Sequence, residues 1–453
     1  MSLKPYSEYK DSGVEWFGLV PAEWIPTKLG RHIAINSGLV DPKSEPFSDM
    51  IMVAPNHIES WTGKIKYTET AAQQGAESGK YQVYKGQIIY SKIRPNLMKA
   101  AIAPFDCLCS ADMYGVDADG DMLSNSFLTY YFLSHEFHDY AVDQSARVAM
   151  PKLNHETLKA TPIFLPPIQD QWAIASYLDR ETAEIDVFIA DQEELIALLG
   201  ERRTATITRA VTKGLDPETP MKNCGLEWLG DVPAGWTVQR LSHVTSAVID
   251  CLHSTPEESD EGKFISIRTG CIRNGRLLPE KGLTIDELTF RERTAKGTPE
   301  VGDVFFTREA PAGEAALVDN LGQYALGQRM VLLKPSSELL DSRFLVWNIY
   351  MPHVRRYIEV EANGSTVKNL PIPDIKSIPI IVPRRDQQQR IIEYLNQEIT
   401  EIDTVIADAR EAIKLSKERR AAVISAAVTG KIDVRGFAAP AAIEMEAESV
   451  GVA

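Results

Sequence analysis

The chain has 453 residues, a formal net charge of −15 and a hydrophobic fraction of 44%. That length indicates two or three domains rather than one, and the apolar content is typical of a protein with buried cores. No apolar run approaches the ~20 residues of a membrane helix, and the N-terminus has no apolar signal core, so we expect a cytoplasmic protein with no membrane partner. The acidic charge counts against a simple nucleic-acid binder, although a DNA phosphate responds mainly to charges within a Debye length of about 8 Å.

The cysteines favour neither disulfides nor a metal site. Their odd number and scattered spacing fit no disulfide framework. The closest pair has no second pair of ligands at the spacing of a zinc site. We therefore expect reduced thiols and no bound metal. The five residues are Cys107, Cys109, Cys224, Cys251 and Cys271.

A short motif near the start of the chain returns in its middle. Residues 14–24 read VEWFGLVPAEW, and residues 226–236 read LEWLGDVPAGW, at an offset of 212. Both contain Glu-Trp, a glycine, Pro-Ala and a final tryptophan in the same order. Internal repeats of this kind indicate a duplicated architecture.

A second and longer repeat is helical. Residues 165–216 align without gaps to residues 382–433, with 24 identities in 52 positions, and share the triplets Glu-Ile-Asp, Glu-Arg-Arg and Ala-Val-Thr. Apolar residues recur at spacings of 4 and 7, which predicts one stripe on each helix, as in a coiled-coil seam. Because a long isolated helix needs a partner for such a stripe, we expect the two copies to pack on each other. The stripe residues are Ile174, Leu178, Ile185, Ile189 and Ile196, and then Ile391, Leu395, Ile402, Ile406 and Ile413.

Two variable segments, at about residues 25–164 and 237–381, fill the space between the repeated blocks and align poorly with each other. Both read as mixed α/β. One apolar-aromatic helix is predicted in each, at residues 126–140 and 342–357, with turns at Gly63-Lys64 and Asn274-Gly275. The predicted strands are 87–91, 264–267, 303–307 and 330–333.

Each variable segment carries a run of basic residues without an intervening acid. Strand alternation would place Lys92 and Arg94 on one face. Arginine and asparagine suit the reading of base edges, and lysine suits phosphate. A solvated strand edge protected by lysines explains each run equally well, but the recurrence at a similar place in both copies favours DNA. The runs are Lys80, Lys85, Lys92, Arg94 and Lys99, and then Lys263, Arg268, Arg273 and Arg276, followed by Arg308 and Arg329.

No catalytic motif is found. The stretch from Gly75 to Tyr81 resembles a phosphate-binding loop but is one residue short and has tyrosine where serine or threonine would hold magnesium. No glycine-rich dinucleotide motif follows a strand, no amino-methyltransferase tetrapeptide is present, and Pro373-Asp374-Ile375-Lys376 is too common a pattern to indicate a nuclease. We therefore expect a non-catalytic protein.

Together these features resemble the specificity subunits of type I restriction-modification enzymes. The resemblance covers about residues 12–433 and rests on the Glu-Trp-x-Gly-x-x-Pro-x-x-Trp openings and on the proline and glutamine that lead into each long helix. It also includes SKIRPN at residues 91–96, FTREAP at 306–311 and NGSTVKNL at 363–370. The first copy departs from the last motif, where SARVAM stands instead. These motifs add Asn96 and Lys368 to the candidate DNA-binding residues.

The resemblance implies a fold and a set of partners. Two mixed α/β target recognition domains, at 1–164 and 217–381, would each read one half of a split double-stranded DNA site. Two conserved helices, at 165–216 and 382–433, would form an antiparallel coiled coil with an internal pseudo-two-fold repeat, followed by a flexible tail at 434–453. Two modification subunits carrying S-adenosylmethionine would dock on this scaffold, and ATP- and Mg-dependent restriction subunits would join them.

Three alternatives remain open from the sequence. The chain could be an enzyme, either a methyltransferase or a nuclease, with unrecognised motifs. It could be a coiled-coil interaction scaffold with no role at DNA. It could also be the specificity subunit of a system that only methylates.

Overall fold

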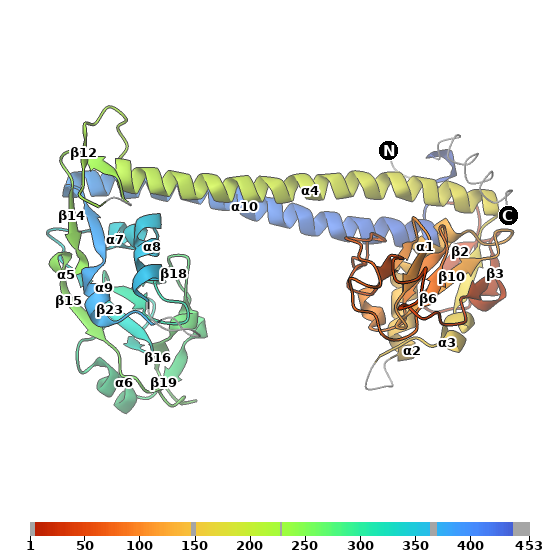
Figure 1. Ribbon diagram of the computed structural model, residues 1–453, viewed down its shortest axis with the longest axis horizontal. Helices are drawn as coiled ribbons and strands as arrows, with labels where there is room; N and C mark the ends of the chain where they lie inside the picture. The colour runs from red at the N-terminus through yellow and green to blue at the C-terminus, as the bar shows by residue number, and fades with distance from the viewer. Residues whose placement is uncertain (1–4, 146–150, 227–228, 363–368, 438–453) are drawn as a thin grey trace. The chain divides into compact units, whose positions relative to one another are not determined.

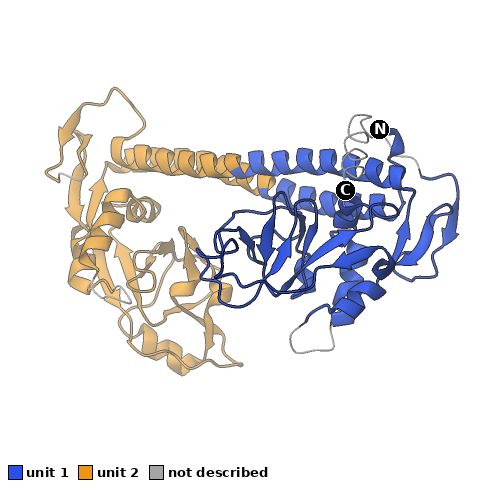
Figure 2. Ribbon diagram, turned by 45° about the vertical axis from the view of Figure 1, so that its right-hand side comes forward, with its two compact units in different colours: residues 1–193, 410–453 blue, residues 194–409 orange. Residues whose placement is uncertain are grey.

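The structure is a computed structural model that describes residues 5–145, 151–226, 229–362 and 369–437. The chain divides into two compact units (Figure 2). The first unit comprises residues 1–193 and 410–453, and the second comprises residues 194–409. Both are mixed α/β, as the sequence predicts.

The first unit is built on a four-stranded antiparallel sheet in the order β4-β10-β7-β8, of which β10 is labelled in Figure 1. The interior strand β7 (Ile88–Ser91) is buried throughout. Ile88 and Tyr90 pack with the helices, whereas Ile89 packs into a core on the other face. This alternation follows because successive side chains of a strand point to opposite faces. The sheet is completed by β4 (Ile33–Ile35), β8 (Ala100–Ile102) and β10 (Met113–Ala118).

Smaller elements surround this sheet. A three-stranded sheet in the order β5-β9-β6 covers one face, and its β5 and β9 run parallel. Short antiparallel pairs join β1 to β2 and β3 to β11. Their bounds are β1 (Tyr9–Asp11), β2 (Leu19–Pro21), β3 (Ile25–Lys28), β5 (Met52–Val53), β6 (Tyr81–Val83), β9 (Cys107–Cys109) and β11 (Pro162–Leu165), with 3-10 turns η1 (Leu29–Arg31) and η2 (Pro95–Leu97).

The second unit repeats this arrangement. Its four-stranded sheet has the order β15-β23-β20-β21, and β20 again divides its residues between two cores, with Val304 and Phe306 on one face and Phe305 on the other. The strands are β12 (Met221–Asn223), β13 (Asp231–Pro233), β14 (Thr237–Arg240), β15 (Thr245–Asp250), β16 (Phe264–Ile267), β17 (Ile272–Arg273), β18 (Arg276–Leu277), β19 (Leu283–Ile285), β20 (Val304–Thr307), β21 (Ala315–Leu317), β22 (Tyr324–Leu326), β23 (Met330–Pro335) and β24 (Pro379–Val382).

The two units differ in the small sheet. Both contain a parallel pair, β5 with β9 and β16 with β22. The third strand joins β9 in the first unit, as β6, but joins β16 in the second unit, as β19. The second unit also has α5 (Leu241–Val244), α6 (Glu287–Thr294), η3 (Thr269–Cys271), η4 (Pro279–Lys281) and the β17–β18 hairpin.

The apolar-aromatic helix predicted in each variable segment is in fact two helices. In the first unit, Ser134 starts the second helix, because its hydroxyl accepts a hydrogen bond from the amide of Phe137 at 3.3 Å. In the second unit Pro352 occupies the first helical position, where its missing N–H is tolerated. The helices are α1 (Asn125–Phe132), α2 (His135–Ser145) and α3 (His155–Ala160), and then α7 (Ser342–Ile349), α8 (Pro352–Glu361) and α9 (Ile372–Ser377).

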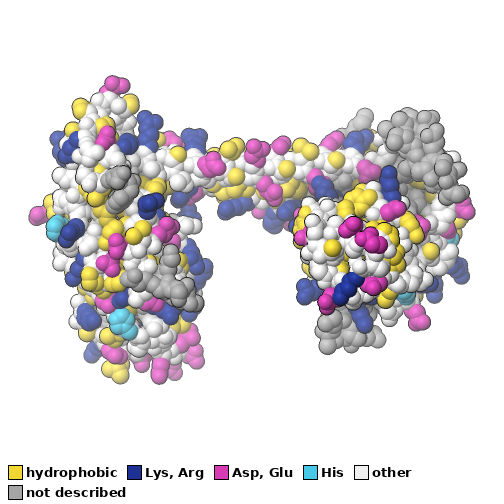
Figure 3. Space-filling model, viewed as in Figure 1, with side chains coloured by type: hydrophobic (Ala, Val, Ile, Leu, Met, Phe, Trp, Pro, Cys, Tyr) yellow, Lys and Arg dark blue, Asp and Glu magenta, His cyan; other side chains and the backbone are white. Residues whose placement is uncertain are grey.

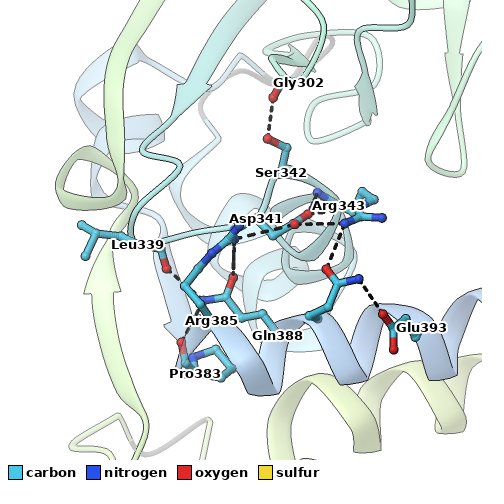
Figure 4. A network of polar contacts seen from close by, with 10 residues as sticks. Gly302, Leu339, Asp341, Ser342, Arg343, Pro383, Arg385, Gln388 and Glu393 are labelled. Atoms are coloured by element: carbon cyan, nitrogen blue, oxygen red, sulfur yellow. Dashed lines mark hydrogen bonds and ion pairs between the residues drawn. The ribbon is translucent and has the colours of Figure 1, made fainter.

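The long helices α4 (Ile168–Lys213) and α10 (Arg385–Val428) each contribute one segment to each unit. A fully buried glutamine near the start of each helix fixes it to the domain. Gln388 accepts a hydrogen bond from the amide of Asp341 at 2.8 Å and donates to the carbonyls of Leu339 and Pro383 at 2.9 and 2.8 Å (Figure 4). Gln171 makes the equivalent three bonds with Ser124, Met122 and Pro166.

The repeated tryptophan motif has a structural role at the opposite helix ends. Trp24 and Trp236 are fully buried. A Cβ at Gly430, which has φ of +72°, would lie 2.4 Å from Pro21 and 3.1 Å from Trp24. A Cβ at Gly214, with φ of +78°, would lie 3.3 Å from Trp236. Glycine therefore ends each helix where the backbone turns left-handed against a motif. Glu227 and Trp228 of the second motif lie outside the described residues.

The predicted helix stripe is buried or half-buried at all ten positions. Its first members do more than line a helix–helix seam. Ile174 and Leu178 belong to the core of the first unit together with Ile424 of α10, and Ile391 and Leu395 belong to the core of the second. The start of each helix is therefore part of a domain core, which periodicity alone did not reveal.

The cysteines are free, as expected. Burial raises the pKa of Cys107 and Cys109 to about 12, so both remain neutral thiols. Within the described parts of the chain, no helix is long and apolar enough to cross a bilayer. The same residues contain no group of three or more histidine, cysteine or carboxylate side chains placed to hold a metal ion.

Candidate nucleic-acid interface

The backbone beyond β7 and the backbone beyond β20 are held in the same way. In the first unit the amide of Lys92 donates to the carbonyl of Asp112 at 3.1 Å, and the Lys92 carbonyl accepts from Leu153 at 2.8 Å. In the second unit Arg308 makes the equivalent bonds with Arg329 at 3.1 Å and Leu370 at 2.9 Å. Two corresponding strand ends are therefore fixed in place while their side chains differ.

Two residues beyond Lys92 and Arg308, the backbone adopts a left-handed conformation in both units. Arg94 has φ of +48° and Ala310 has φ of +50°, and each precedes a proline. A positive φ is unusual for residues other than glycine and persists only where the surroundings enforce it. Here the amide of Arg94 is held by the carbonyl of Pro151 at 3.1 Å. The exposed side chains of Arg94 and Asn96 are consequently presented from a fixed loop rather than from a strand. Lys92 and Arg94 were expected on one face by strand alternation, but β7 ends at Ser91, so the alternation does not extend to them.

The strand end of the first unit is surrounded by cations. The Lys92 ammonium lies 5.0 Å from the ring centroid of Tyr114, a cation–π distance. The pKa of Lys99 is lowered by burial and then by the charges of Lys66 and Arg94, so these groups lie near one another. We name Lys66, Lys92, Arg94 and Lys99 the strand-end cation cluster. Lys66 has a distant ion pair with Glu59 at 3.8 Å, and the other three have no carboxylate partner among the described residues.

Neighbouring groups are consistent with this positive environment. Burial first, and then Lys159 and Lys92, lower the pKa of His155. Burial, and then Tyr81, raise the pKa of Tyr114 to about 12, so the ring beneath Lys92 carries no charge. Lys92 therefore lies near two neutral aromatic groups and a second cation, Lys159. On the surface viewed in Figure 3, acidic and basic side chains lie side by side on each unit.

The corresponding strand end of the second unit is neutralised internally. Arg308 is only 8% exposed, and its guanidinium donates to both oxygens of Asp250 at 3.0 and 2.9 Å and to the side chain of Asn369 at 3.2 Å. Arg329 pairs with Glu309 at 3.1 Å. Arg308 was expected to contact DNA directly, and in the structure its guanidinium is engaged by Asp250 and Asn369.

The other predicted contacts are of three kinds. Lys80 is 6% exposed and its ammonium is occupied by Ser78, so its burial argues against a phosphate contact. Arg268 donates to the carbonyl of Lys281 at 2.8 Å, and Arg276 pairs with Asp403 of α10 at 2.8 Å, so neither guanidinium is unpartnered. The exposed candidates with no ion-pair partner in the described chain are Lys85, Lys263 and Arg273, with Lys85 at the far end of β7 from Lys92.

Comparison with known families agrees with this duplicated organisation. The family model described as "Type I restriction modification DNA specificity domain" matches residues 54–194 and 233–414. The chain belongs to this family. The two matches together cover more than half of the chain and include both strand ends described above.

Several relatives within this specificity family are recognisable. The EcoDI specificity subunit of Escherichia coli is 35% identical over 191 residues, which is 42% of each chain. A putative type I restriction enzyme specificity subunit, MjaX, from Methanocaldococcus jannaschii is 22% identical over 92% of this chain and 96% of its own. The chain thus spans less than half of the EcoDI subunit but nearly all of the MjaX subunit.

A solved structure shares the fold of the specificity family. A chain from work on the complex assembly and conformational transition of the type I R-M system matches with a TM-score of 0.63 and 19% identity. The match covers 90% of this chain and 98% of that chain. At this level of identity the likeness concerns the fold.

Sequence reasoning missed several residues of the site. Asp250 lies 58 positions from Arg308 and meets it across the sheet, which no local pattern predicts. Lys66 was overlooked although it follows the Gly63-Lys64 turn, and Tyr114 was overlooked because an isolated aromatic residue in a strand reads as core. Lys368, a predicted DNA contact, and residues 146–150 and 363–367 lie outside the described residues.

Proposed function

We propose that the chain is the sequence-specific DNA-recognition subunit of a type I restriction-modification complex. The observation that carries the proposal is the pair of corresponding strand ends. Their backbones make equivalent hydrogen bonds, yet one presents Lys92 and Arg94 whereas the other presents Arg308 paired with Asp250. A constant scaffold with different side chains at one position is what two readers of different half-sites require.

The first reader would act through its cations and its fixed loop. Lysine and arginine of the strand-end cation cluster would hold phosphates and set the register. Arg94 and Asn96 would then approach base edges, where a good bidentate contact gives about 1–3 kcal/mol of discrimination. In the second unit Arg273 and Lys263 are the exposed cations best suited to phosphate, and Arg308 would support the reading loop.

The long helices would set the distance between the readers as an antiparallel coiled coil with pseudo-two-fold symmetry. Ion pairs at equivalent positions support this. Glu181 pairs with Arg419 at 3.4 Å in the first unit, and Glu398 pairs with Arg202 at 3.5 Å in the second. Recognition domains at 1–164 and 217–381, helices at 165–216 and 382–433, and a tail at 434–453 remain our proposed division.

The catalytic work would belong to partner proteins. Two modification subunits would bring S-adenosylmethionine, and restriction subunits would bring ATP- and Mg-dependent activity, in the cytoplasm. The chain itself would be non-catalytic, and a system that only methylates would use it in the same way. Purified chain incubated with labelled S-adenosylmethionine and DNA should therefore transfer no methyl group without a modification subunit.

Mapping methylated bases tests the proposal directly. A genome carrying this chain with its modification subunit should show one bipartite motif with a fixed gap. A chain lacking residues 25–164, expressed with the same partner, provides the matched control and should lose the motif. Methylation at a single continuous site, or a motif independent of the chain, would contradict the proposal.

A further inference from the structure

We propose that Asp186 and Asp403 are positioning residues that fix the orientation of each recognition domain on the helices, and thereby the permitted gap between half-sites. This inference rests on the function proposed above. Both aspartates come from the repeated Glu-Ile-Asp triplet, and each is the centre of a three-member ion cluster within its own unit. The triplets were recognised in the sequence without any assigned role.

In the first unit the cluster joins three separate segments. Asp186 of α4 pairs with Lys64 of the recognition domain at 2.7 Å and with Arg420 of α10. Arg420 also donates to the carbonyl of Thr62 at 2.8 Å. Both partners from the helices therefore contact one turn of the domain, at residues 62–64.

The second unit contains an equivalent cluster, whose helix residues come from the other copies of the Glu-Ile-Asp and Glu-Arg-Arg triplets. Asp403 of α10 pairs with Arg276 of the recognition domain at 2.8 Å and with Arg203 of α4 at 3.2 Å. The shared offset of 217 relates Asp186 to Asp403 and Arg203 to Arg420. Lys64 and Arg276 each directly follow a glycine with positive φ, Gly63 and Gly275. The recurrence of all three roles in a diverged domain argues against a chance surface contact.

The domain residue in each cluster is carried on a turn that is itself fixed. In the second unit, Asn274 and Gly275 both have positive φ, as a two-residue hairpin turn requires. The amide of Gly275 is held by the hydroxyl of Tyr350 at 2.8 Å, and the amide of Asn274 by Glu314 at 2.9 Å. A lysine or arginine on so rigid a turn can transmit orientation from helix to domain.

In the first unit the turn is held by two backbone hydrogen bonds and one aromatic contact. The amide of Trp61 donates to Met98 at 3.1 Å, the amide of Glu59 donates to Lys64 at 2.9 Å, and the Trp61 ring lies 5.2 Å from that of His135. Met98 ends the loop that presents Arg94 and Asn96. A continuous set of contacts therefore runs from Asp186 through the turn to the proposed reading loop.

Burial predicts which cluster matters more. The side chains of Asp186 and Arg420 are 17% and 7% exposed, whereas those of the equivalent Asp403 and Arg203 are 29% and 26% exposed. Exposed pairs contribute little, and pairs shielded from water are costly to break. Loss of Asp186 should therefore disturb its domain more than loss of Asp403 disturbs the other.

The test measures gap selectivity separately from base selectivity. Asp186→Asn and Arg276→Met would be assembled with the modification subunit and assayed on DNA whose two half-sites are separated by the native gap or by one base pair more or less. Glu181→Gln and Glu398→Gln are matched controls, because they remove a helix–helix ion pair that touches no recognition domain. Arg276→Lys is the conservative variant, and Arg276→Met guards against misfolding because Arg276 is largely exposed.

We expect Asp186→Asn to reduce discrimination between the native and altered gaps by about tenfold and Arg276→Met by about threefold, with half-site base preferences retained. Arg276→Lys and both controls should keep wild-type gap selectivity. Unchanged gap selectivity in both test variants, or an equal loss in the controls, would overturn the inference. Failure of the wild-type complex to select any bipartite site would instead overturn the proposed function.

Discussion

The two strand ends of this molecule share a backbone and differ in chemistry. Beyond β7, Lys92 and Arg94 are free of carboxylate partners among the described residues and are accompanied by Lys66 and Lys99. Beyond β20, Arg308 is buried against Asp250 and Asn369. The difference teaches that equivalent basic residues in a duplicated protein need not do equivalent work. Lys92 lies over the Tyr114 ring without a carboxylate partner among the described residues, whereas the equivalent Arg308 is paired with Asp250.

The buried glutamines should give the largest and most equal effects, because they belong to the shared part of the two units. Gln171→Leu and Gln388→Leu each remove the side-chain partner of two carbonyls and one amide, at buried or part-buried hydrogen bonds. Each unpaired group costs about 1–3 kcal/mol, so we expect each variant to lose about 3–5 kcal/mol of unfolding free energy. Denaturant unfolding of the purified chain measures the loss. A change below about 1 kcal/mol in only one variant would show that the two anchors are not equivalent, and such a change in both would contradict their role as anchors.

Substitution of Arg308 should lower the stability of the chain, whereas substitution of Arg94 should weaken DNA binding without lowering stability. Arg308→Met leaves the Asp250 carboxylate without its partner, so the second unit should lose about 2–3 kcal/mol of stability. Arg94→Met should leave stability within about 0.5 kcal/mol, because the side chain is exposed. It should instead weaken binding by the assembled complex and relax the base preference of one half-site, with about 1–3 kcal/mol of discrimination lost, because Arg94 is proposed to read a base edge.

Thermal unfolding and salt-dependent binding titrations of both variants check this pair of expectations. Lys85→Met is the matched control for Arg94→Met, since it removes an exposed cation at the far end of the same strand. Equal loss of DNA binding in Lys85→Met would show that the cation cluster has no special role. A stable, fully folded Arg308→Met variant with reduced salt slope would make Arg308 a direct DNA contact after all.

The second residue of α2 differs from the second residue of α8, and this difference should give the stability of the two units different pH dependences. It is Glu136, paired with Lys431 at 2.9 Å, in the first unit and His353 in the second. Burial lowers the pKa of His353 from 6.5 to about 4, so the folded state resists protonation that the unfolded state accepts. Stability from this group is complete above pH 6.5 and is lost as pH falls from 6.5 towards 4.

His353→Gln should therefore remove part of the acid sensitivity. At pH 5 the lowered pKa costs the wild-type chain about 2 kcal/mol relative to pH 7, and the variant should lose correspondingly less over that interval. Urea unfolding of both proteins at the two pH values gives the comparison. A parallel pH dependence of wild type and variant would show that His353 is not the group responsible.

Local sequence patterns predicted most of the helices and strands, but they did not predict the long-range contacts between side chains. The strands at β7, β16, β20 and β23 and both long helices follow from apolar alternation and period, and the structure confirms them. The break between α1 and α2 was missed because apolar periodicity continues across Ser134, and only its hydroxyl bond to Phe137 reveals a new start. The pairs that decide which cations are available, Arg308 with Asp250 and Arg276 with Asp403, connect residues 58 and 127 positions apart. Nothing local encodes such pairs.

The central claim is that the repeated frame sets the spacing of two half-sites while the variable domains set their sequence. One helix-lengthening experiment tests it directly: insertion of a heptad into both α4 after residue 193 and α10 after residue 409, followed by mapping of methylated sites with the modification subunit. Seven helical residues add about 10 Å, or about 3 base pairs of DNA. The account predicts a longer gap between two unchanged half-sites. Altered half-sites across an unchanged gap would contradict it.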